Sequence, residues 1–447
     1  MNNLCFHLKT YGCQMNERDS EAVAHLLEEH GFRQVESERA ADIIVLNTCS
    51  VRETAENKAI GKAGILLRLK RENPDLILII MGCMAQNRGA ELLRKIPHLD
   101  AVVGTDQLHQ LPQVVEQAVA GKRRQARLAT GTEIMGRLQG RREAGVSAFV
   151  SVMRGCDQYC SYCIVPKVRG REKSRPMQDI VAEVSRLAEQ GCREVFLLGQ
   201  NITAYGLAEA RREDVFSPDI SPFAELLQAV DQVPGIQRIR FTSPHPRHMN
   251  WKFMEAATGL AKVCESFHIP LQSGSDRILR AMRRGYDAAD YLRCIERLRE
   301  RLPNATFSTD VIVGFPGESE EDFAATRHLM EEVGFDMAYV FKYSPRSGTR
   351  AAQWPDDVPV EVKEQRNQIL LDDLAARARR RNRRYVGAVL EVLLEGPSKR
   401  NRRRWSGRSR ENKVCLVDSS DQLRPGQLVE VKITRSTGSS LFGEIVV

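Results

Sequence analysis

The sequence has no long hydrophobic run. The longest apolar stretch of the 447 residues, at positions 76–84, is interrupted by Gly82 and reaches about half the length of a membrane-spanning helix. No basic segment followed by an apolar one precedes the first strand-like residues, so a secretory signal peptide is not expected. We therefore expect a cytoplasmic protein without a membrane segment.

Aromatic residues are also few, at 6% of the chain, and repetitive tracts are absent. With 42% hydrophobic and 28% charged residues, the composition excludes a disordered or fibrous chain. The length predicts about three domains. Neither a Ser/His/Asp triad nor a phosphate-binding glycine loop stands out, and the nine histidines are scattered. The cysteines are therefore the strongest candidates for residues that carry the chemistry.

Eleven cysteines are an odd number in a chain without a secretory signal. This count fits free thiols or metal ligands in a reducing compartment better than a disulfide framework. Six of the cysteines form two groups, which are described below. The other five stand alone in mixed or apolar surroundings and are interpreted as small buried hydrophobes: Cys5, Cys192, Cys264, Cys294 and Cys415.

The first group lies in a region that alternates strand-like and helix-like segments, a rhythm that predicts a parallel sheet with helices on its faces. Cys13, Cys49 and Cys83 each follow a predicted strand, with gaps of 36 and 34 residues. Because parallel strands end at one edge of their sheet, where open α/β folds bind ligands, the topology predicts a metal site there. The predicted strands are 5–10, 42–47, 76–81 and 101–103, and the helices are 16–30, 52–71 and 87–95.

A second series of strands and helices follows. Six strands over about 200 residues predict a barrel that falls short of the eight-stranded closed form. A charged helix at 360–384 leads out of it, and short β-like pieces with Gly/Pro turns predict a small β-barrel. The predicted barrel strands are 148–153, 194–198, 238–242, 266–270, 308–313 and 337–343, and those of the small barrel include 389–394, 427–433 and 441–446.

The predicted organisation is thus an α/β protein with three domains. They are an N-terminal parallel-sheet domain at 1–120, a partial (β/α)6 barrel at 146–373 and a small β-barrel at 374–447. Residues 121–145, with seven Lys/Arg against two Glu, are predicted to be a linker.

The basic charge is concentrated in the last domain. Residues 374–447 carry 17 Lys/Arg and 7 Asp/Glu, whereas the rest of the chain carries 49 and 51. A basic cluster attracts polyphosphate, and a neighbouring aromatic can stack on a base, so nucleic acid is favoured over a merely solvated basic face. The residues predicted to bind RNA are Lys399, Arg400, Arg402, Arg403, Arg404 and Trp405.

The second cysteine group is Cys156, Cys160 and Cys163, in a C-x3-C-x2-C pattern within eight residues. A structural zinc site requires four closed ligands, so zinc would need a fourth ligand from elsewhere. A [4Fe–4S] cluster can be held by three cysteines, which leaves one iron open to a small molecule. The iron–sulfur interpretation is favoured because the loop follows the first strand of the predicted barrel.

This pattern, with Tyr162 before its last cysteine, resembles the hallmark of the radical S-adenosylmethionine superfamily. In that superfamily, the open iron binds the amino and carboxylate groups of S-adenosylmethionine, and one electron cleaves the sulfonium to a 5′-deoxyadenosyl radical. The resemblance therefore implies a [4Fe–4S] cluster on Cys156, Cys160 and Cys163.

The trio Cys13, Cys49 and Cys83 upstream of such a domain resembles the methylthiotransferase family, in which three N-terminal cysteines hold a second [4Fe–4S] cluster. The resemblance runs nearly end to end and includes Leu-Gly-Gln-Asn at 198–201, His-Ile-Pro-Leu-Gln-Ser-Gly-Ser at 268–275 and Asp-Val-Ile-Val-Gly-Phe-Pro-Gly-Glu at 310–318. The tail resembles the small RNA-binding TRAM domain of that family. Its segment Leu-Glu-Gly-Pro-Ser-Lys at 394–399 resembles the branch that acts on dimethylallyladenosine.

The resemblance implies methylthiolation of C2 of N6-dimethylallyladenosine, next to the anticodon at position 37 of tRNA. One S-adenosylmethionine would methylate a sulfur held at the auxiliary cluster, and a second would be the radical source. The implied partners are the tRNA anticodon stem-loop, an electron donor such as flavodoxin and a sulfur source. A monomer is expected, and no catalytic side chain beyond the cluster ligands is predicted.

Candidate cofactor-binding residues follow from the same resemblance. Tyr162 is placed against the adenine of S-adenosylmethionine, with plain loop packing as the alternative. Gly199, Gln200 and Asn201 end a strand where the family lets backbone approach the cofactor, although a simple turn would look the same. The remaining candidates lie at strand ends or in a tight turn facing the presumed barrel mouth: Gln272, Asp310, Gly314 and Gly317.

Three other functions remain open. A sister enzyme of the family acts on N6-threonylcarbamoyladenosine in tRNA, and another relative modifies an aspartate of a ribosomal protein. The strongly basic tail argues against a protein substrate. A non-catalytic iron–sulfur protein that binds RNA is a different class, which offers no reason for two groups of three cysteines at strand ends.

Overall fold

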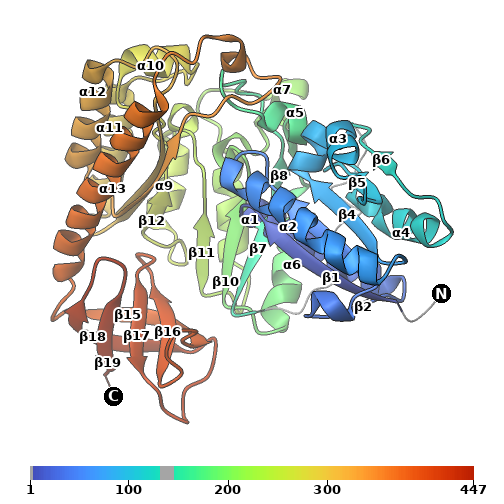
Figure 1. Cartoon of the computed structure of the whole chain (residues 1–447). Coiled ribbons are helices and arrows are strands. Elements are labelled where there is room, and N and C mark those ends of the chain that lie inside the picture. The colour runs from blue at the N-terminus through green and yellow to red at the C-terminus, as the bar shows by residue number, and fades with distance from the viewer. Residues whose placement is uncertain (1–3, 131–144, 447) are drawn as a thin grey trace. The chain divides into compact units, whose positions relative to one another are not determined.

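The computed structural model describes residues 4–130 and 145–446 (Figure 1). Residues 131–144 of the predicted linker therefore lie outside the described residues. The chain divides into two compact units, and each is described by itself. The first comprises Met1–Glu143, Arg154–Asp157 and Cys163–Glu172, and the second comprises Ala144–Met153, Gln158–Tyr162 and Lys173–Val447. None of the described helices has the length and apolar character needed to span a bilayer.

A six-stranded parallel sheet forms the centre of the first unit, as the sequence predicted. Its strand order is β2-β1-β3-β4-β5-β6. β1 pairs with β3 from Phe6 opposite Ile43 to Tyr11 opposite Thr48. The strands are β1 (Cys5–Tyr11), β2 (Arg33–Gln34), β3 (Ile43–Thr48), β4 (Ile77–Gly82), β5 (Ala101–Val103) and β6 (Gln125–Arg127).

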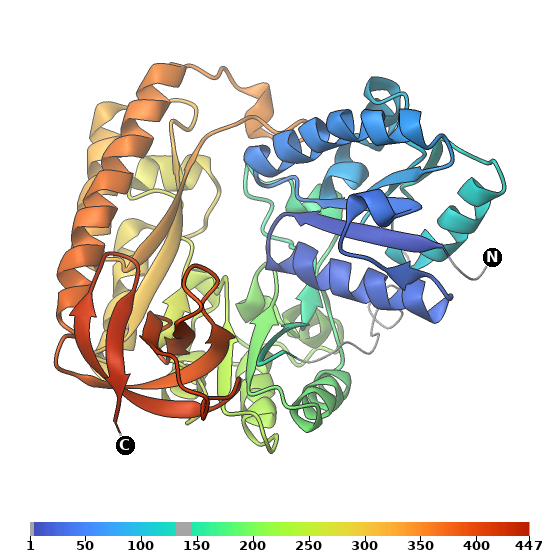
Figure 2. The same cartoon turned by 60° about the horizontal axis from the view of Figure 1, so that its bottom comes forward.

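Helices cover both faces of this sheet. α1 (Gln14–Glu29) and α4 (Leu111–Val119) pack on one face, against a core that contains Val45 and Ile79. α2 (Glu53–Glu72) and α3 (Cys83–Lys95) pack on the other, against Leu46 and Ile80. Figure 2 shows α1 and α2 on opposite sides of the strands. Because both faces are buried, β3 begins with four apolar residues and β4 with five.

Six parallel strands in the second unit form a partial barrel, which confirms that prediction. They make two three-stranded sheets, β11-β10-β7 and β12-β13-β14, and the parallel bridges Ile239–Val263 and Thr242–His268 lie between them. Alternate residues of β13 are fully buried and partly exposed, because one face packs on helices and the other faces the open interior. The strands are β7 (Ser147–Ser151), β10 (Glu194–Leu198), β11 (Arg238–Phe241), β12 (Ser266–His268), β13 (Thr306–Val313) and β14 (Met337–Lys342).

The longer helices of this series alternate with its strands, and one large apolar core joins them to the sheet. They are α6 (Met177–Glu189), α8 (Pro222–Asp231), α9 (Trp251–Gly259), α11 (Ala288–Arg301) and α12 (Glu320–Val333). The shorter elements are β8 (Met153–Arg154), α5 (Val165–Arg169), β9 (Lys173–Ser174), α7 (Leu207–Arg212) and α10 (Asp276–Ala281).

The C-terminal strands close into a small barrel in the order β15-β16-β17-β19-β18. Its core contains Trp405, Val431 and Leu441. Two of its strands, β16 and β17, were not predicted. Charged and small residues interrupt the apolar pattern of β16, and β17 has a run of only four apolar residues. The strands are β15 (Val389–Pro397), β16 (Arg404–Ser409), β17 (Val414–Asp418), β18 (Leu428–Ser436) and β19 (Leu441–Ile445).

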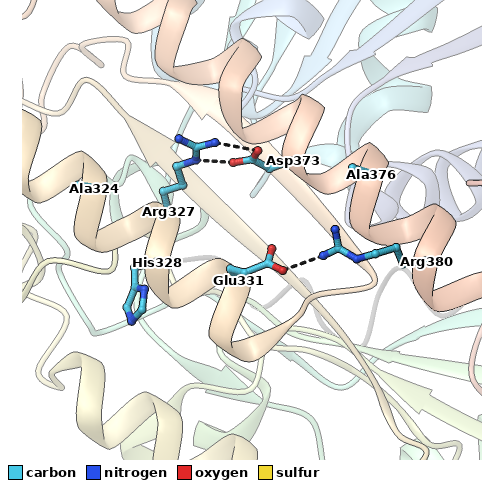
Figure 3. Close-up of a pocket in the computed structure, with 7 residues that line it drawn as sticks. All are labelled: Ala324, Arg327, His328, Glu331, Asp373, Ala376 and Arg380. Atoms are coloured by element: carbon cyan, nitrogen blue, oxygen red, sulfur yellow. Dashed lines mark hydrogen bonds and ion pairs between the residues drawn. The ribbon is translucent and has the colours of Figure 1, made fainter.

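The helix α13 (Val360–Arg383) carries the chain from the partial barrel to the small one. Figure 3 shows the groove of about 470 Å³ between α12 and α13, where Arg327 and Asp373 form a two-pronged ion pair at 2.6 and 3.0 Å. One turn further on, Glu331 binds Arg380 at 2.7 Å. These pairs satisfy the charges of the groove and fasten α13 to the core.

Two elements cross the predicted domain boundaries. β6 joins the first sheet from within the segment predicted as a linker, and α13 continues through the predicted boundary at 373–374. Both boundaries were placed where the charge composition changes. A change in surface charge does not require a helix or a sheet to end, which explains the difference.

Buried arginines fasten the small barrel to the end of the strands where β11 begins. The fully buried Arg238 binds the Glu391 carboxylate at 2.8 Å and the Arg408 carbonyl at 2.6 Å. Arg240 donates to the carbonyls of Arg410 and Ser409 at 2.8 and 2.7 Å. The loop that carries Cys160 follows the opposite, carboxyl end of the first barrel strand.

Candidate metal centres and nucleic-acid surface

The first cysteine group lies where the two halves of the first sheet diverge. α1 leaves the end of β1 toward one face and α2 leaves the end of β3 toward the other, so these strand ends form the kind of switch point at which open α/β sheets bind ligands. Cys13 and Cys49 follow β1 and β3, and Cys83 follows the neighbouring β4. The expectation that the fold brings these three cysteines together is confirmed.

The three thiols influence one another's ionisation. A hydrogen bond from Cys49 lowers the pKa of the Cys13 thiol to about 5. The same hydrogen bond, together with burial, raises the pKa of Cys49 well above its ordinary value. Burial raises the pKa of Cys83, and the charge of Cys13 acts on it as well. The hydrogen bond between Cys49 and Cys13 thus favours the thiolate at Cys13, and the thiolate is the form that binds metals.

A buried amide network holds the ends of β1 and β3 beside α1. The Asn47 side chain donates to the Asn16 carbonyl at 2.8 Å and to Ser20 Oγ at 2.9 Å, and the Asn16 side chain donates to Asn47 Oδ1 at 3.1 Å. Asn16 Oδ1 in turn accepts the Cys13 backbone N–H at 3.3 Å. Sequence reasoning missed both asparagines, whose only sequence signal was their place beside the cysteine motifs.

Gly82 precedes Cys83 in a conformation that favours glycine, with φ at +92°. A Cβ atom there would collide with the Asn47 side chain and approach the Thr48 carbonyl oxygen to 2.9 Å. The absence of a side chain lets α3 begin directly at Cys83, close to the neighbouring strand end.

The short helix α5 completes the surroundings of Cys83. Ile164 and Val168 pack with Cys83 in one apolar cluster. The next residue, Arg169, has a side chain that is 4% exposed and donates to Asp19 at 2.7 Å, and it also hydrogen-bonds to the Cys83 thiol. α5 thus brings a buried positive charge, already paired with a carboxylate, to this cysteine group.

The second cysteine group occupies the loop that follows β8. The Cys156 N–H donates to the Gly170 carbonyl at 3.2 Å. Further along, Ser161 donates through its N–H to the Met282 carbonyl at 3.0 Å and through its Oγ to the Ala281 carbonyl at 2.8 Å. Cys160 accepts a hydrogen bond from Arg284 Nη1 at 3.3 Å. The loop is therefore held by backbone and side-chain hydrogen bonds rather than by regular secondary structure.

The donor chemistry of both groups fits an iron–sulfur cluster. Each offers three cysteines that form no disulfide, a set that leaves one iron of a [4Fe–4S] cluster open. Among residues 4–130 and 145–446, no three His, Cys, Asp or Glu side chains stand close enough to hold a single metal ion. A cluster requires a different arrangement, since each of its cysteines binds a different iron atom. The assignment of the ligands stays a prediction.

Of the predicted cofactor residues, Tyr162 and those after β10 have contacts within the protein. The Tyr162 ring packs edge-on against Phe315, with centroids 6.5 Å apart. Asn201 is buried and contacts Thr203 at 3.2 Å and His248 at 3.4 Å. A Cβ on Gly199 would come within 2.7 Å of Met153. Gln200 follows in the same turn, and contact of these residues with a cofactor stays a prediction.

Gln272 follows the end of β12, whereas Asp310 lies within β13, three residues before its end, and not at a strand end as predicted. The Gln272 N–H donates to the Asp310 carbonyl at 2.8 Å, and Gln272 has φ at +73°. The Asp310 carboxylate lies 3.3 Å from Nε2 of His268. Their predicted role at a cofactor is not contradicted by this placement and stays a prediction.

The tight turn at Gly314 has a structural explanation of its own. Its φ is +68°, its N–H donates to the Glu318 carboxylate at 2.6 Å, and a side chain there would collide with Lys363. In the same turn, the Gly317 N–H donates to Asp357 at 2.7 Å. Glycine is therefore required at position 314 whether or not a cofactor approaches.

The basic cluster forms an exposed tip between β15 and β16. Lys399, Arg400, Arg402 and Arg403 are all exposed there, and Arg404 is partly buried. The prediction that Trp405 stacks on a base is wrong, because this side chain is 8% exposed and belongs to the core of the small barrel. Its position on β16 points inward, since side chains of a strand alternate between faces.

An aromatic residue that sequence reasoning missed lies on the surface of the same barrel. Phe442 is partly exposed on β19, and the guanidinium groups of Arg404 and Arg435 lie 5.1 and 3.7 Å from its ring centroid. Only the closed barrel brings these three residues together, because Arg435 and Phe442 are on β18 and β19 while Arg404 is on β16. The sequence offers no signal for that arrangement.

Three family models match the chain. Residues 150–330 match the Radical SAM superfamily, and residues 383–446 match the TRAM domain. Residues 5–104 match a model described as Uncharacterized protein family UPF0004, and this span contains the first cysteine group.

Similar proteins cover nearly the whole chain. A tRNA-2-methylthio-N(6)-dimethylallyladenosine synthase of Opitutus terrae is 48% identical over 98% of this chain and 97% of its own length. A protein of the same name from Akkermansia muciniphila is 45% identical over 98% of both chains. Among solved structures, the radical S-adenosylmethionine methyltransferase TsrM from Kitasatospora setae has a TM-score of 0.58 at 14% identity, and the match covers 78% of this chain and 74% of that one. This last likeness shows a shared fold.

Proposed function

The chain belongs to the family of tRNA-2-methylthio-N(6)-dimethylallyladenosine synthases, and from that premise we propose that it methylthiolates C2 of N6-dimethylallyladenosine next to the anticodon of tRNA. Membership in the radical SAM superfamily implies S-adenosylmethionine and one [4Fe–4S] cluster. We propose Cys156, Cys160 and Cys163 as the ligands of that cluster. A second cluster on Cys13, Cys49 and Cys83 is part of the same proposal.

The observation that carries the proposal is the convergence of Cys13, Cys49 and Cys83 at neighbouring strand ends of the first sheet. An aromatic C–H has no useful acidity, so replacing it with sulfur requires radical chemistry, which a cofactor supplies while the protein positions it. Radical generation needs one open cluster, whereas sulfur transfer needs a second place to hold sulfur. A second group of three thiols without a fourth cysteine meets that need.

The protein's own residues build these two places. The Asn16–Asn47 network and Gly82 fix the three strand ends, so the thiols converge before any metal is bound. The hydrogen bonds of Ser161 to the residues after α10 hold the second loop against the partial barrel. When bound, the clusters and S-adenosylmethionine supply the radical and the sulfur.

We propose that the exposed tip at 398–403 binds phosphates of the anticodon stem-loop. Its cations have no regular element around them and can adapt to a backbone, while base recognition is left to the barrel. Changing Arg402 and Arg403 together to Ala should weaken tRNA binding by about tenfold at moderate salt and flatten the dependence of log Kd on log salt. Arg68→Ala, on exposed α2, is the matched control. Equal affinity and slope for both proteins would remove the tip from the interface.

A cytoplasmic location, where tRNA is found, is part of this proposal. The electron donor and the sulfur source are proposed only by class, as a low-potential one-electron carrier and an anionic sulfur compound. The alternative functions are methylthiolation of threonylcarbamoyladenosine in tRNA, methylthiolation of an aspartate of a ribosomal protein, and RNA binding without catalysis.

The test is anaerobic reconstitution with iron and sulfide, followed by reductant, S-adenosylmethionine and tRNA bearing either dimethylallyl- or threonylcarbamoyl-adenosine. Nucleoside mass spectrometry should find the methylthio product only with the dimethylallyl substrate. Product with the other tRNA alone would keep the chemistry and change the substrate. Absence of both product and 5′-deoxyadenosine would overturn the proposal in favour of a non-catalytic RNA-binding protein.

A further inference from the structure

Arg284 stands out as a buried guanidinium beside a cysteine of the second group. It lies in the turn after α10, and the residue is 7% exposed. Its Nη1 donates to Cys160 Sγ at 3.3 Å, its Nη2 to the Pro270 carbonyl at 3.4 Å and its Nε to the Tyr286 hydroxyl at 3.0 Å. All three donor nitrogens are therefore engaged, and one of them points at a sulfur atom.

The charge of Arg284 has no carboxylate partner in the part of the chain that the structure describes. The side chains that act on it most strongly by charge are Tyr286, Tyr162 and Cys160, and it also acts on the buried His245. By contrast, the buried Arg240 is paired with Glu194 at 2.6 Å. A buried cation without a counter-ion is costly, so an anion is expected beside it. The group it contacts that can carry negative charge at neutral pH is the sulfur of Cys160 once it binds metal.

The orientation of the guanidinium is fixed from behind. The Tyr286 hydroxyl accepts from Arg284 and itself lies 2.9 Å from the carbonyls of Pro270 and Leu271. The residues just before Arg284 are bound to the cysteine loop through Ser161. One turn of chain therefore both grips the loop and presents a positive charge to its cysteine.

We propose that Arg284 is a positioning residue for the radical cluster: it supplies the positive charge that balances the cluster's thiolates and makes the cluster easier to reduce. A hydrogen bond to a ligating sulfur and a nearby positive charge both favour the more negative, reduced state. Cleavage of S-adenosylmethionine begins with that reduction. This inference rests on the proposed function only in taking Cys156, Cys160 and Cys163 as cluster ligands.

The first test measures the midpoint potential of the radical cluster by redox titration with electron paramagnetic resonance, without S-adenosylmethionine or tRNA. Cys13, Cys49 and Cys83 are changed to Ala in every protein, so that a single cluster contributes to the signal. Arg284→Met should shift the one-electron reduction equilibrium about tenfold toward the oxidised cluster, or about 59 mV more negative. Arg284→Lys, which keeps a cation, should retain most of the original potential.

Arg240→Met is the matched control, because it removes a buried arginine of β11 that is paired with Glu194 and contacts the small barrel. Its potential should equal that of the parent protein. If Arg284→Met holds the same iron as the parent and its potential is unchanged, the inference is overturned.

A second readout needs no substitution at Arg284 in the parent protein, in case that substitution prevents cluster assembly. Cys13, Cys49 and Cys83 are again changed to Ala, so that Arg169, which hydrogen-bonds to Cys83, contributes no coupling. Arginine labelled with ¹⁵N in its guanidinium group should give a hyperfine coupling to the reduced radical cluster. Arg284→Lys should abolish the coupling while the cluster remains, whereas Arg240→Met should keep it. A labelled parent protein without any coupling would contradict the inference.

These measurements separate the inference from the proposed function. A protein that shows the ¹⁵N coupling and the potential shift but makes no methylthio product would keep the role of Arg284 and lose the substrate. If the parent protein makes the methylthio product but the potential of Arg284→Met is unshifted, the proposed function stands and the role of Arg284 is refuted.

Discussion

Cys156, Cys160 and Cys163 follow one another on one loop, whereas Cys13, Cys49 and Cys83 come from the ends of three strands. The cysteines of the loop group are close together in the sequence, so they are near one another before the domain folds. The strand group exists only when β1, β3 and β4 pair in register. The loop group therefore depends on a local sequence motif, whereas the strand group depends on correct folding of the whole sheet.

The electrostatic surroundings of the two groups differ as well. Near the strand group, Arg169 is paired with Asp19, and Arg154 is paired with Asp106 at 2.7 Å. Near the loop group, the described contacts of Arg284 include no carboxylate. A paired guanidinium presents a dipole to its cluster, while an unpaired one presents a full charge. We therefore expect Arg284 to change the reduction potential of the radical cluster more than Arg169 changes that of the auxiliary cluster.

The largest expected effect separates the roles of the two groups. Cys156→Ala should abolish both 5′-deoxyadenosine and methylthio product, because the radical cluster is lost. Cys49→Ala should abolish the methylthio product but leave S-adenosylmethionine cleavage. Both nucleosides are quantified by mass spectrometry after reconstitution. Equal loss of S-adenosylmethionine cleavage in the two variants would contradict separate roles for the two groups. Full activity in both variants would refute the cluster assignments.

The next prediction concerns the dependence of the strand group on its sheet. Gly82→Ala should destabilise the first unit by about 2 to 4 kcal/mol, because it adds both backbone strain and a collision with Asn47. Gly121→Ala is the control: its φ is +87° but no atom lies near the new Cβ, so only about 1 to 2 kcal/mol of strain is expected. Hydrogen exchange of the β3 and β4 amides measures both. Equal protection in the two variants would show that close approach at Gly82 is unimportant.

A pH effect should distinguish Cys13 within its own group. In cluster-free protein the pKa of Cys13 is lowered to about 5, while those of Cys49 and Cys83 are raised. A lowered pKa means that the reactive thiolate persists down to about pH 5 and is lost below it. Alkylation of Cys13 should therefore be constant from pH 8 to about pH 6 and fall as the pH passes through about 5. A rate that falls already between pH 9 and 8 would contradict the hydrogen bond from Cys49.

The smallest expected effect comes from a substitution that gives the strand group an arginine without a carboxylate partner, as in the loop group. Asp19→Asn removes the carboxylate of Arg169 and should shift the auxiliary cluster to a more positive potential, by less than tenfold in the reduction equilibrium. The cluster is observed alone after Cys156, Cys160 and Cys163 are changed to Ala. Asp75→Asn, at a fully exposed aspartate of the same unit, should leave the potential in place. A negative shift for Asp19→Asn would reverse the electrostatic argument.

The cysteines and the partial barrel could be predicted from sequence because each follows from a strong local rule. The βα rhythm places Cys13, Cys49 and Cys83 at one edge of a sheet. The burial of Trp405 could not be predicted in the same way, because a basic stretch conceals the alternation of β16. The stacking prediction failed for that reason.

The supporting residues escaped prediction because their partners are distant in sequence. Asn47 meets Asn16 across 31 residues, and Arg284 meets Cys160 across 124. Nothing in the local sequence marks these pairs, since their role depends on which strands and turns the fold places side by side. The chemistry-bearing residues were therefore predictable, whereas the residues that tune them were not.

The most direct test of the two-site account is the iron and acid-labile sulfide content of three reconstituted proteins. They are the parent chain, a variant with Cys13, Cys49 and Cys83 changed to Ala, and a variant with Cys156, Cys160 and Cys163 changed to Ala. The account predicts that each variant keeps half of the parent's iron and the spectrum of one [4Fe–4S] cluster. A variant with the parent's full content, or one group that accounts for all of the iron, would contradict it.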